Sequence, residues 1–433
     1  MSFIKFSNFR FPSISFSSRI YIVIFFIASF IFIVSSCVFN ADYKDQTAPI
    51  EKDGNKLVGS TQCKKCHATI YDQFVKTAHS KTSMPANKDN VKGSFKEGDN
   101  SYVFSYYDGV MMQDLDSGLY QVNFLNRKFD KAYKFDIVIG SGTRGQSYLH
   151  WNENRLFQLP ISYFTTSNSW SNSPGYADDF ANFGRPIGSQ CMGCHSSYVD
   201  VISDEKKQFE EFDKSNIVYG INCEKCHGAG GNHVDLFTAN PTAKGDKLIV
   251  NASNLSQSLQ LDACAVCHSS NAANLKPALY FKTGDSLDHS HIQTNQQVKV
   301  DVHGNQYGLL IESKCFVKST TMTCSTCHNP HEQQRGDLAM FSQKCMQCHT
   351  PEKATFCKMT NKMGVAALQK NCIDCHMQNK ESQMLNVKLD PTENHSPAVI
   401  RSHLISVHPE GATKISEMFL RETSTKPEKN GRF

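Results

Sequence analysis

The hydrophobic residues of this chain follow different patterns along its length. Residues 20–34 form an uninterrupted apolar run. Between residues 102 and 139, apolar positions instead alternate with other residues in three sets: Tyr102, Phe104 and Tyr106; Tyr120, Val122 and Phe124; Phe135, Ile137 and Ile139. Turn-forming residues separate these sets. Alternation between turns is typical of half-buried antiparallel strands, so we predict a β subdomain of three to six strands.

Other segments carry weaker patterns. Residues 71–80 have helical character, and residues 156–164 indicate an edge strand because Pro160 cannot donate a ladder hydrogen bond. Residues 298–302 and 308–311 are candidates for a β pair, and residues 384–389 for a strand. No long periodic helix follows residue 191.

The apolar run has the surroundings of an export signal. Basic residues precede it without any acidic residue, and small residues follow it at positions 35–36: the basic residues are Lys5, Arg10 and Arg19. This arrangement predicts a secretory signal peptide over residues 1–36.

Cys37 follows Val34, Ser35 and Ser36, a tetrad that resembles a bacterial lipobox, in which the cysteine is acylated. Two or more acyl chains would anchor the protein stably to a membrane, with residues 37–58 as a polar tether. The alternative is that residues 20–39 remain as an uncleaved membrane-spanning helix. Both interpretations place the rest of the chain in the cell envelope, outside the cytoplasm.

Length and charge narrow the class of protein. The chain has 433 residues, enough for two or three modest domains. Its 45 Lys and Arg residues against 41 Asp and Glu residues give a net charge of only +4, so we expect no nucleic-acid partner.

Cysteine spacing carries the strongest chemical information. The chain has 17 cysteines, and 14 of them form seven copies of C-x-x-C-H. The motif cysteines are Cys63 and Cys66, Cys191 and Cys194, Cys223 and Cys226, Cys264 and Cys267, Cys324 and Cys327, Cys345 and Cys348, and Cys372 and Cys375. The adjoining histidines are His67, His195, His227, His268, His328, His349 and His376.

C-x-x-C-H is the attachment motif of c-type haem: two thiols bind the porphyrin edge, and the adjacent histidine is the proximal iron ligand. Zinc sites do not require a histidine directly after the second cysteine, and thioredoxin-like dithiols need a βαβ context that is not visible here. We therefore predict seven covalent haems.

Ten further histidines could bind the opposite faces of the irons. The candidates are His79, His233, His303, His331, His395, His403 and one of His289 and His291, of which we favour His291. His150 and His408 are expected to be ordinary hydrogen-bonded histidines. Methionine thioethers are a weaker alternative, because methionine more often serves packing.

Cys315 and Cys357 belong to no motif. An exported chain matures under oxidising conditions, so we predict a disulfide between them. The alternative is that Cys357 is a buried thiol, or a thiolate ligand to a haem.

Six segments within residues 58–408 make the chain resemble the cytochrome c-552/c-554-like multihaem cytochromes with paired C-x-x-C-H motifs. These segments are VGS (58–60), RLFQLP (155–160), SPGY (173–176), GINCEKCHG (220–228), CSTCHNPH (324–331) and CIDCHM (372–377). The resemblance implies a mainly α fold with much irregular structure, in a multihaem cytochrome c architecture with an inserted antiparallel β subdomain.

The expected organisation after the tether is a first haem-binding segment (59–90), the β subdomain (91–185), a six-haem domain (186–410) and a tail (411–433). Relatives often carry a histidine cluster between the last two motifs, where this sequence has Cys357, Lys358 and Met359. The ligand of one late haem therefore stays open.

These features predict an exported, membrane-anchored heptahaem cytochrome that transfers electrons between envelope partners: other cytochromes or a membrane quinol-oxidising complex. A reductase of nitrite, hydroxylamine or a related oxyanion at one open haem is an alternative, although no C-x-x-C-K motif is present. A docking subunit of a respiratory complex is a third possibility.

Overall fold

The computed structural model describes residues 54–203, 208–269, 272–274, 279–293, 301–353, 356–389, 395–409, 412–413 and 415–417. The predicted signal peptide, Cys37, most of the tether and most of the tail lie outside these residues. Among the helices of the described residues, none combines the length and the apolar character needed to cross a bilayer.

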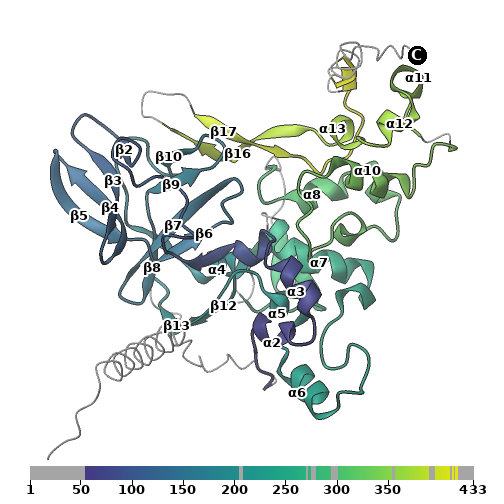
Figure 1. Cartoon of the computed structure of the whole chain (residues 1–433), viewed down its shortest axis with the longest axis horizontal. Coiled ribbons are helices and arrows are strands. Elements are labelled where there is room, and N and C mark those ends of the chain that lie inside the picture. The colour runs from purple at the N-terminus through teal and green to yellow at the C-terminus, as the bar shows by residue number, and fades with distance from the viewer. Residues whose placement is uncertain are drawn as a thin grey trace, which may run out of the picture. The chain divides into compact units, whose positions relative to one another are not determined.

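A seven-stranded antiparallel sheet occupies much of the first half of the described chain (Figure 1). Its strands are β1 (Ser83–Pro85), β6 (Ile137–Ile139), β7 (Gly145–Asn152), β8 (Arg155–Gln158), β9 (Ile161–Phe164), β10 (Ser169–Asn172) and β11 (Arg185–Ile187). The segment predicted as one edge strand is interrupted before Ile161. Both of its halves are paired on two sides, β8 with β7 and β11, and β9 with β7 and β10.

A second sheet has the order β2-β3-β4-β5 (Ser101–Val103, Gly109–Leu115, Gly118–Leu125 and Lys128–Lys134). Its inner face packs on the larger sheet through a cluster that includes Phe135, Tyr148 and Trp170, all almost fully buried. Antiparallel strands are therefore present where the insertion was predicted, but in the described residues they number eleven in two sheets rather than three to six, and β1 and β11 extend beyond residues 91–185. Strands such as β2 and β3 alternate buried with more exposed residues, which makes this part of the fold predictable from the sequence.

Helices dominate after Gly188 but are short, and the longest in the described residues has twelve residues. The α-helices are α2 (Ser60–Lys64), α3 (Ala68–Phe74), α4 (Ser189–His195), α5 (Cys223–His227), α6 (Gly231–Ala239), α7 (Gln257–His268), α8 (Gln306–Ile311), α9 (Lys314–Val317), α10 (Leu338–Met346), α11 (Thr360–Met363), α12 (Val365–Leu368) and α13 (Ile373–His376). Short 3₁₀ turns are η1 (His79–Lys81), η2 (Ala252–Asn254), η3 (Leu287–His289) and η4 (Cys324–Thr326).

The predicted mainly α class is wrong. In the described residues, strands contribute about as many residues as helices, and the sheets are antiparallel. The reason is that most haem motifs need only a single helical turn, so the motif-rich half adds little helix per motif.

Three hairpins complete the fold: β12–β13 (Ser196–Val201 and Phe212–Tyr219), β14–β15 (Ala272–Asn274 and His291–Gln293) and β16–β17 (Asn379–Val387 and Ser396–Arg401). The strand predicted at residues 384–389 lies largely in β16. The strand predicted at residues 308–311 is wrong, because this segment lies in helix α8, whose N-terminus is capped by Asn305.

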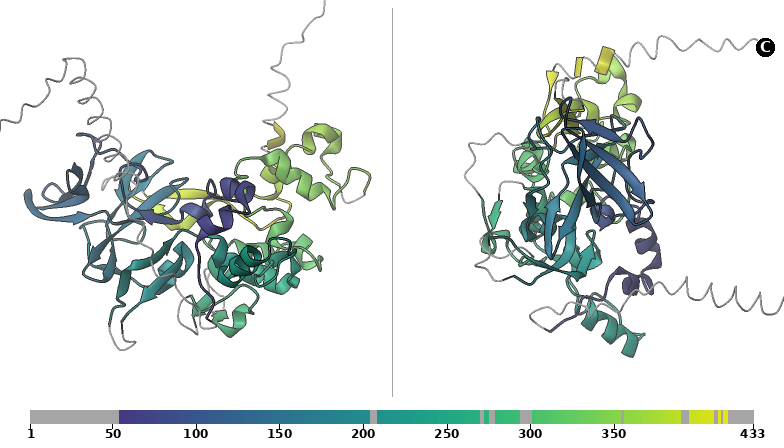
Figure 2. Two further views of the ribbon diagram at one scale, coloured as in Figure 1. Left: turned by 60° about the horizontal axis from the view of Figure 1, so that its bottom comes forward. Right: turned by 90° about the vertical axis from the view of Figure 1, so that its left-hand side faces the viewer.

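The last hairpin links the motif-bearing helices to the sheets. Figures 1 and 2 both show β16 and β17 running from α13 towards the strands. Val387 and Ala398 of the hairpin pack on Phe164 of β9, and the backbone N–H of Asn172 donates to the carbonyl of Lys388. The β16–β17 hairpin that follows α13 is therefore fixed to strands β9 and β10 of the large sheet.

Candidate functional site

Each C-x-x-C-H motif forms about one helical turn. The backbone N–H of the histidine donates to the carbonyl of the first cysteine at 2.8 Å in motif 1 (His67 to Cys63) and 3.0 Å in motif 5 (His328 to Cys324). Residues i, i+3 and i+4 lie on one face of such a turn. Both thiols and the imidazole can therefore approach one side of a single macrocycle.

The seven motifs surround one large cavity. Its volume is about 2980 Å³, about three times the upper end for ordinary ligand pockets. The histidine and at least one cysteine of every motif line it.

The other ten histidines divide clearly. Seven line the cavity: His79, His233, His291, His303, His331, His403 and His408. His150 and His289 do not line it, nor does His395, whose Nε2 lies 3.0 Å from a carboxylate oxygen of Asp178. The structure therefore does not bring the predicted ligand His395 to the motifs.

His408 was not among the predicted ligands, yet it lines the cavity and its Nε2 is buried without a hydrogen-bond partner. His195 and His403 each have a buried, unpartnered Nδ1. Buried polar atoms normally have partners, so orphaned ring nitrogens in this cavity indicate groups that the polypeptide alone does not supply. No local spacing in the sequence separated His408 from His395.

Three motif histidines face a second histidine closely. Ring centroids are 6.2 Å apart for His268 and His79, 5.9 Å for His227 and His331, and 5.8 Å for His328 and His403. A histidine nitrogen lies about 2.0–2.1 Å from a bound metal such as zinc, so two imidazoles on opposite sides of one iron have centroids about 6 Å apart. Each pair could therefore hold one iron between its two rings, at motifs 4, 3 and 5 respectively.

Hydrogen bonds fix the orientation of several rings. Nδ1 lies 2.8 Å from the Val250 carbonyl in His227 and 2.9 Å from the Ser406 carbonyl in His376. His233 makes the same contact, at 2.8 Å, with the carbonyl of Lys247. An Nδ1–H held by a carbonyl leaves Nε2 as the free nitrogen, which is the usual arrangement of a metal-binding histidine.

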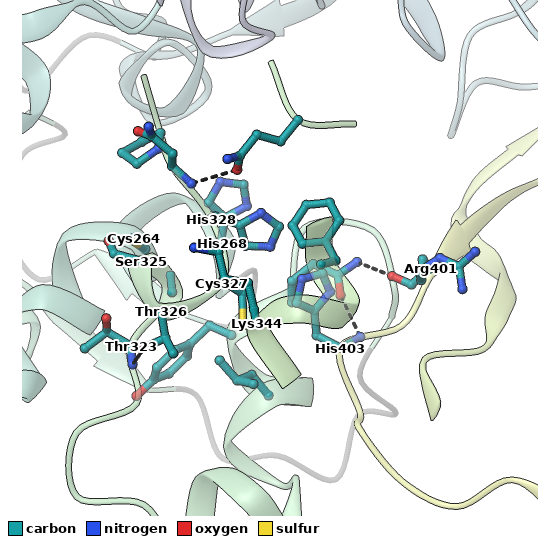
Figure 3. A pocket seen from close by; sticks show the side chains of 18 of the residues that line it. Cys264, His268, Thr323, Ser325, Thr326, Cys327, His328, Lys344, Arg401 and His403 are labelled. Carbon is teal, nitrogen blue, oxygen red and sulfur yellow. Dashed lines mark hydrogen bonds between the residues drawn. The ribbon is translucent and has the colours of Figure 1, made fainter. Parts of the chain in front are cut away.

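Burial also keeps the rings uncharged. It lowers the pKa of both His268 and His403 to about 4, and the charge of His328 adds to the effect at each ring. Figure 3 shows these three imidazoles gathered in one part of the cavity. Neutral imidazole is the form that binds a metal, so the electrostatics match the geometry.

Contacts between cysteines of different motifs give the order of the sites. The helical turns that carry the motifs are in contact, and their thiols lie within electrostatic range, for motifs 1 and 3 (Cys63 and Cys223), motifs 2 and 4 (Cys194 and Cys267), motifs 4 and 5 (Cys264 and Cys324), and motifs 6 and 7 (Cys345 and Cys372).

Weaker electrostatic neighbours complete the series, with Cys226 of motif 3 near motif 4 and Cys327 of motif 5 near Cys348 of motif 6. The spatial order is therefore 1–3–4–5–6–7, with motif 2 beside motif 4.

A residue inside motif 3 explains why motif 1 lies next to it. The buried carboxylate of Glu224 accepts hydrogen bonds from the backbone N–H groups of Val58 (2.8 Å), Gly59 (2.8 Å) and Gly230 (2.9 Å). Val58 and Gly59 precede the helix that carries Cys63. Glu224 therefore ties the first motif to the third.

Motif 7 is held in a similar way. Arg401 of β17 forms an ion pair of 2.6 Å with Asp374, inside the motif, and donates to the carbonyl of Met377 at 2.7 Å. Two residues later, His403 approaches His328 of motif 5. The C-terminal end of β17 therefore contacts both motif 7, through Arg401, and motif 5, through His403.

The predicted disulfide is not formed: Cys315 and Cys357 both carry free thiols. Cys315 lies near Cys327 and Cys345 of motifs 5 and 6, whereas Cys357 lies near Cys375 of motif 7. The two leftover cysteines therefore face different haem motifs.

Comparison with known proteins agrees with this site. The family model described as cytochrome c554 and c-prime matches residues 62–102 and 175–228. Multiheme cytochrome MtrA of Shewanella baltica (strain OS185) is 24% identical over 189 residues, which are 40% of this chain and 55% of that protein. The chain thus spans little more than half of that relative.

Among solved structures, the outer cell wall cytochrome OcwA has a TM-score of 0.53 at 18% identity, covering 83% of this chain and 81% of that one. An undecahaem cytochrome from the S-layer of Carboxydothermus ferrireducens has a TM-score of 0.37 at 16% identity, over 87% of this chain and 55% of that one.

The fold and the motif-lined cavity define a c-type cytochrome with several haems. In sequence the chain is similar to the cytochrome c554 and c-prime family over the matched residues and, at 24% identity, to a multihaem cytochrome.

Proposed function

We propose that the protein is a heptahaem electron carrier of the cell envelope. The observation that carries this proposal is that the cavity is lined by seven motif histidines and by an equal number of histidines outside the motifs. All 17 histidines of the chain lie in the described residues, so this division covers every one.

Histidines on both faces favour electron transfer over substrate binding. When bound, c-type haem supplies reversible one-electron chemistry at iron. Fourteen cavity histidines could fill both axial positions of all seven irons, which would leave no position for a substrate. The pairs His268–His79, His227–His331 and His328–His403 support this arrangement at three sites.

The spatial order of the motifs supports a continuous route. Motif 1 at one end and motif 7 at the other are joined through motifs 3, 4, 5 and 6, and motif 2 branches at motif 4. Electrons would enter and leave near the ends: His67 of motif 1 is exposed, and so is His349 of motif 6, the neighbour of motif 7, whereas His195 of motif 2 is half-buried. Suitable partners are other cytochromes or a membrane quinol-oxidising complex, with acylated Cys37 as the anchor.

The test is the mature protein itself. Intact mass should show seven haem increments, ferric absorption and EPR spectra should show low-spin iron with no response to nitrite, and the reduced protein should not respond to CO. A high-spin ferric signal that nitrite removes, or a ferrous spectrum that CO changes, would instead favour an oxyanion reductase with one open site. A mass with fewer than seven increments after complete maturation would contradict the heptahaem proposal.

A further inference from the structure

Two adjoining hairpin turns of the smaller sheet present large apolar side chains to solvent. The turns join β2 to β3 and β4 to β5, and both lie at the same end of the sheet because successive strands are antiparallel. Tyr106, Tyr107, Leu125 and Phe129 are each more than half exposed there, and the exposed fraction of Tyr106 is 72%. A single exposed apolar side chain is ordinary, whereas four at adjoining turns indicate an interaction surface. These four residues and Arg127 are called the hairpin tip below.

Hydrogen bonds join the two turns to each other. The N–H of Arg127 donates to the carbonyl of Tyr107 at 2.7 Å, and its Nε donates to the carbonyl of Tyr106 at 3.2 Å. Asp108 Oδ1 accepts from the N–H of Asn126 at 2.9 Å. The guanidinium carbon of Arg127 lies 3.5 Å from the ring centroid of Tyr106, and the ring centroids of Tyr106 and Tyr107 are 5.1 Å apart. The aromatic and cationic groups are therefore held together as one unit.

The backbone of Arg127 adds a second indication that its side chain has a role. Asn126 and Arg127 have φ values of +52° and +60°, which the two central residues of a type I′ turn require. Glycine and asparagine adopt this conformation readily, whereas a long side chain is disfavoured there. An arginine in such a turn carries a backbone cost, and costs of this kind are concentrated at functional surfaces.

The charges around the hairpin tip favour an anionic partner. Arg127, Lys128 and Lys131 are exposed, and in the part of the chain that the structure describes no carboxylate lies within ion-pair distance of them. Two carboxylates lie nearby, those of Asp108 and Asp130, and each already accepts a hydrogen bond within the sheet. Positive charge therefore exceeds negative charge beside the exposed rings.

Aromatic rings beside cations are typical of groups that dock at a membrane surface. The rings lie at the boundary between headgroups and hydrocarbon, and the cations approach lipid phosphates. A redox partner protein fits less well, because no residue of the hairpin tip lines the haem cavity. We propose that the hairpin tip docks on the surface of an anionic lipid bilayer. This contact goes beyond the proposed electron-carrier function and does not depend on acylation of Cys37.

The experiment is acetylation of tyrosine by N-acetylimidazole in the mature holoprotein, with the modified sites located by peptide mass mapping. Vesicles of phosphatidylcholine mixed with phosphatidylglycerol should protect Tyr106 and Tyr107, whereas vesicles of phosphatidylcholine alone should leave both reactive. Acyl chains on Cys37 would insert into either kind of vesicle, so the difference between the two lipids reports the hairpin tip. High salt should remove the protection because it screens surface charges.

Two variants test the two kinds of contact. Lys128→Gln/Lys131→Gln should require about 25-fold more of the phosphatidylglycerol vesicles for half protection, because each charge near an anionic surface is worth about fivefold in binding. Tyr106→Ser should also weaken protection, with Tyr107 as the reporter. Haem number by intact mass confirms that each variant is fully assembled, and it tests the electron-carrier proposal separately.

The matched controls lie at the opposite end of β3. Lys88→Gln removes an exposed lysine that pairs with Asp114, and Leu115→Ser removes an exposed apolar side chain. Both should leave half protection unchanged. Equal protection by the two lipids, or protection that the tip variants leave unaltered, would overturn the proposal. Protection by soluble envelope proteins but by neither lipid would also overturn it, and would assign the hairpin tip to a protein partner.

Discussion

His79 and His268 face each other with ring centroids 6.2 Å apart, although His79 lies in the first haem-binding segment and His268 ends motif 4. The contact is long-range because η1, which begins at His79, is attached to the segment before motif 3: the N–H of Ile221 donates to the carbonyl of His79 at 2.9 Å. The backbone before motif 3 thus positions a histidine that faces the histidine of motif 4.

We expect His79→Ala to open the haem of motif 4 alone. The variant should retain all covalent haems, because attachment uses Cys264 and Cys267, and gain one high-spin ferric signal. EPR spectra measure the spin state, and intact mass measures the haem number. A spectrum identical to the wild type would show that His79 is not a ligand.

The second prediction separates two histidines near the C-terminus. His408→Ala should produce a high-spin signal, because this side chain lines the cavity with an unpartnered Nε2. His395→Ala is the control, since His395 binds Asp178 outside the cavity and its loss should leave the spectrum low-spin. The reverse result would restore His395 as the ligand expected from the sequence.

The sequence predicted the chemistry of this protein better than its arrangement. Spacing alone pointed to the motif cysteines and histidines, because attachment to a single haem is a local requirement, and the structure brings every motif to one cavity. The β insertion was also predictable, since alternation is visible over a few residues. The choice of distal histidines was not predictable from the sequence. Whether His395 or His408 reaches the cavity depends on the position of the β16–β17 hairpin, which is set by contacts such as that of Ala398 with Phe164.

The same limit explains the missing disulfide. Cys315 and Cys357 were paired by elimination, but Cys315 lies beside motifs 5 and 6 and Cys357 beside motif 7. We therefore expect both thiols to react with iodoacetamide in denatured holoprotein without reductant. Peptide mapping by mass spectrometry reads the result, and a peptide pair released only by reductant would contradict the structure.

Glu224 provides a prediction about assembly. Glu224→Gln should lower the free energy of unfolding by about 1.5–3 kcal/mol, because hydrogen bonds to a charged acceptor are lost at a buried site. The melting temperature should fall, and reduced haem attachment at motif 1 should accompany it because one of the two oxygens that accept from Val58 and Gly59 is replaced by an NH₂ group. The control is Glu153→Gln, whose side chain is 83% exposed and should change neither measurement.

Gly220 tests how closely the His79 segment must pack. Its φ is +68°, and a Cβ atom there would overlap the carbonyl oxygen of Ser80. Gly228 has a similar φ of +76°, but a Cβ atom at that position would meet no atom within 4 Å. Gly228→Ala therefore reports the conformational cost alone, about 1–2 kcal/mol.

Gly220→Ala adds the overlap, which backbone atoms relieve only by moving Ser80 and with it His79. We expect a larger fall in melting temperature than for Gly228→Ala, together with a high-spin signal at motif 4 that resembles the signal of His79→Ala. Thermal denaturation and EPR spectra of the two glycine variants, measured side by side, decide the matter. Equal losses of stability and an unchanged low-spin spectrum would show that the approach of residue 220 to Ser80 does not position the ligand.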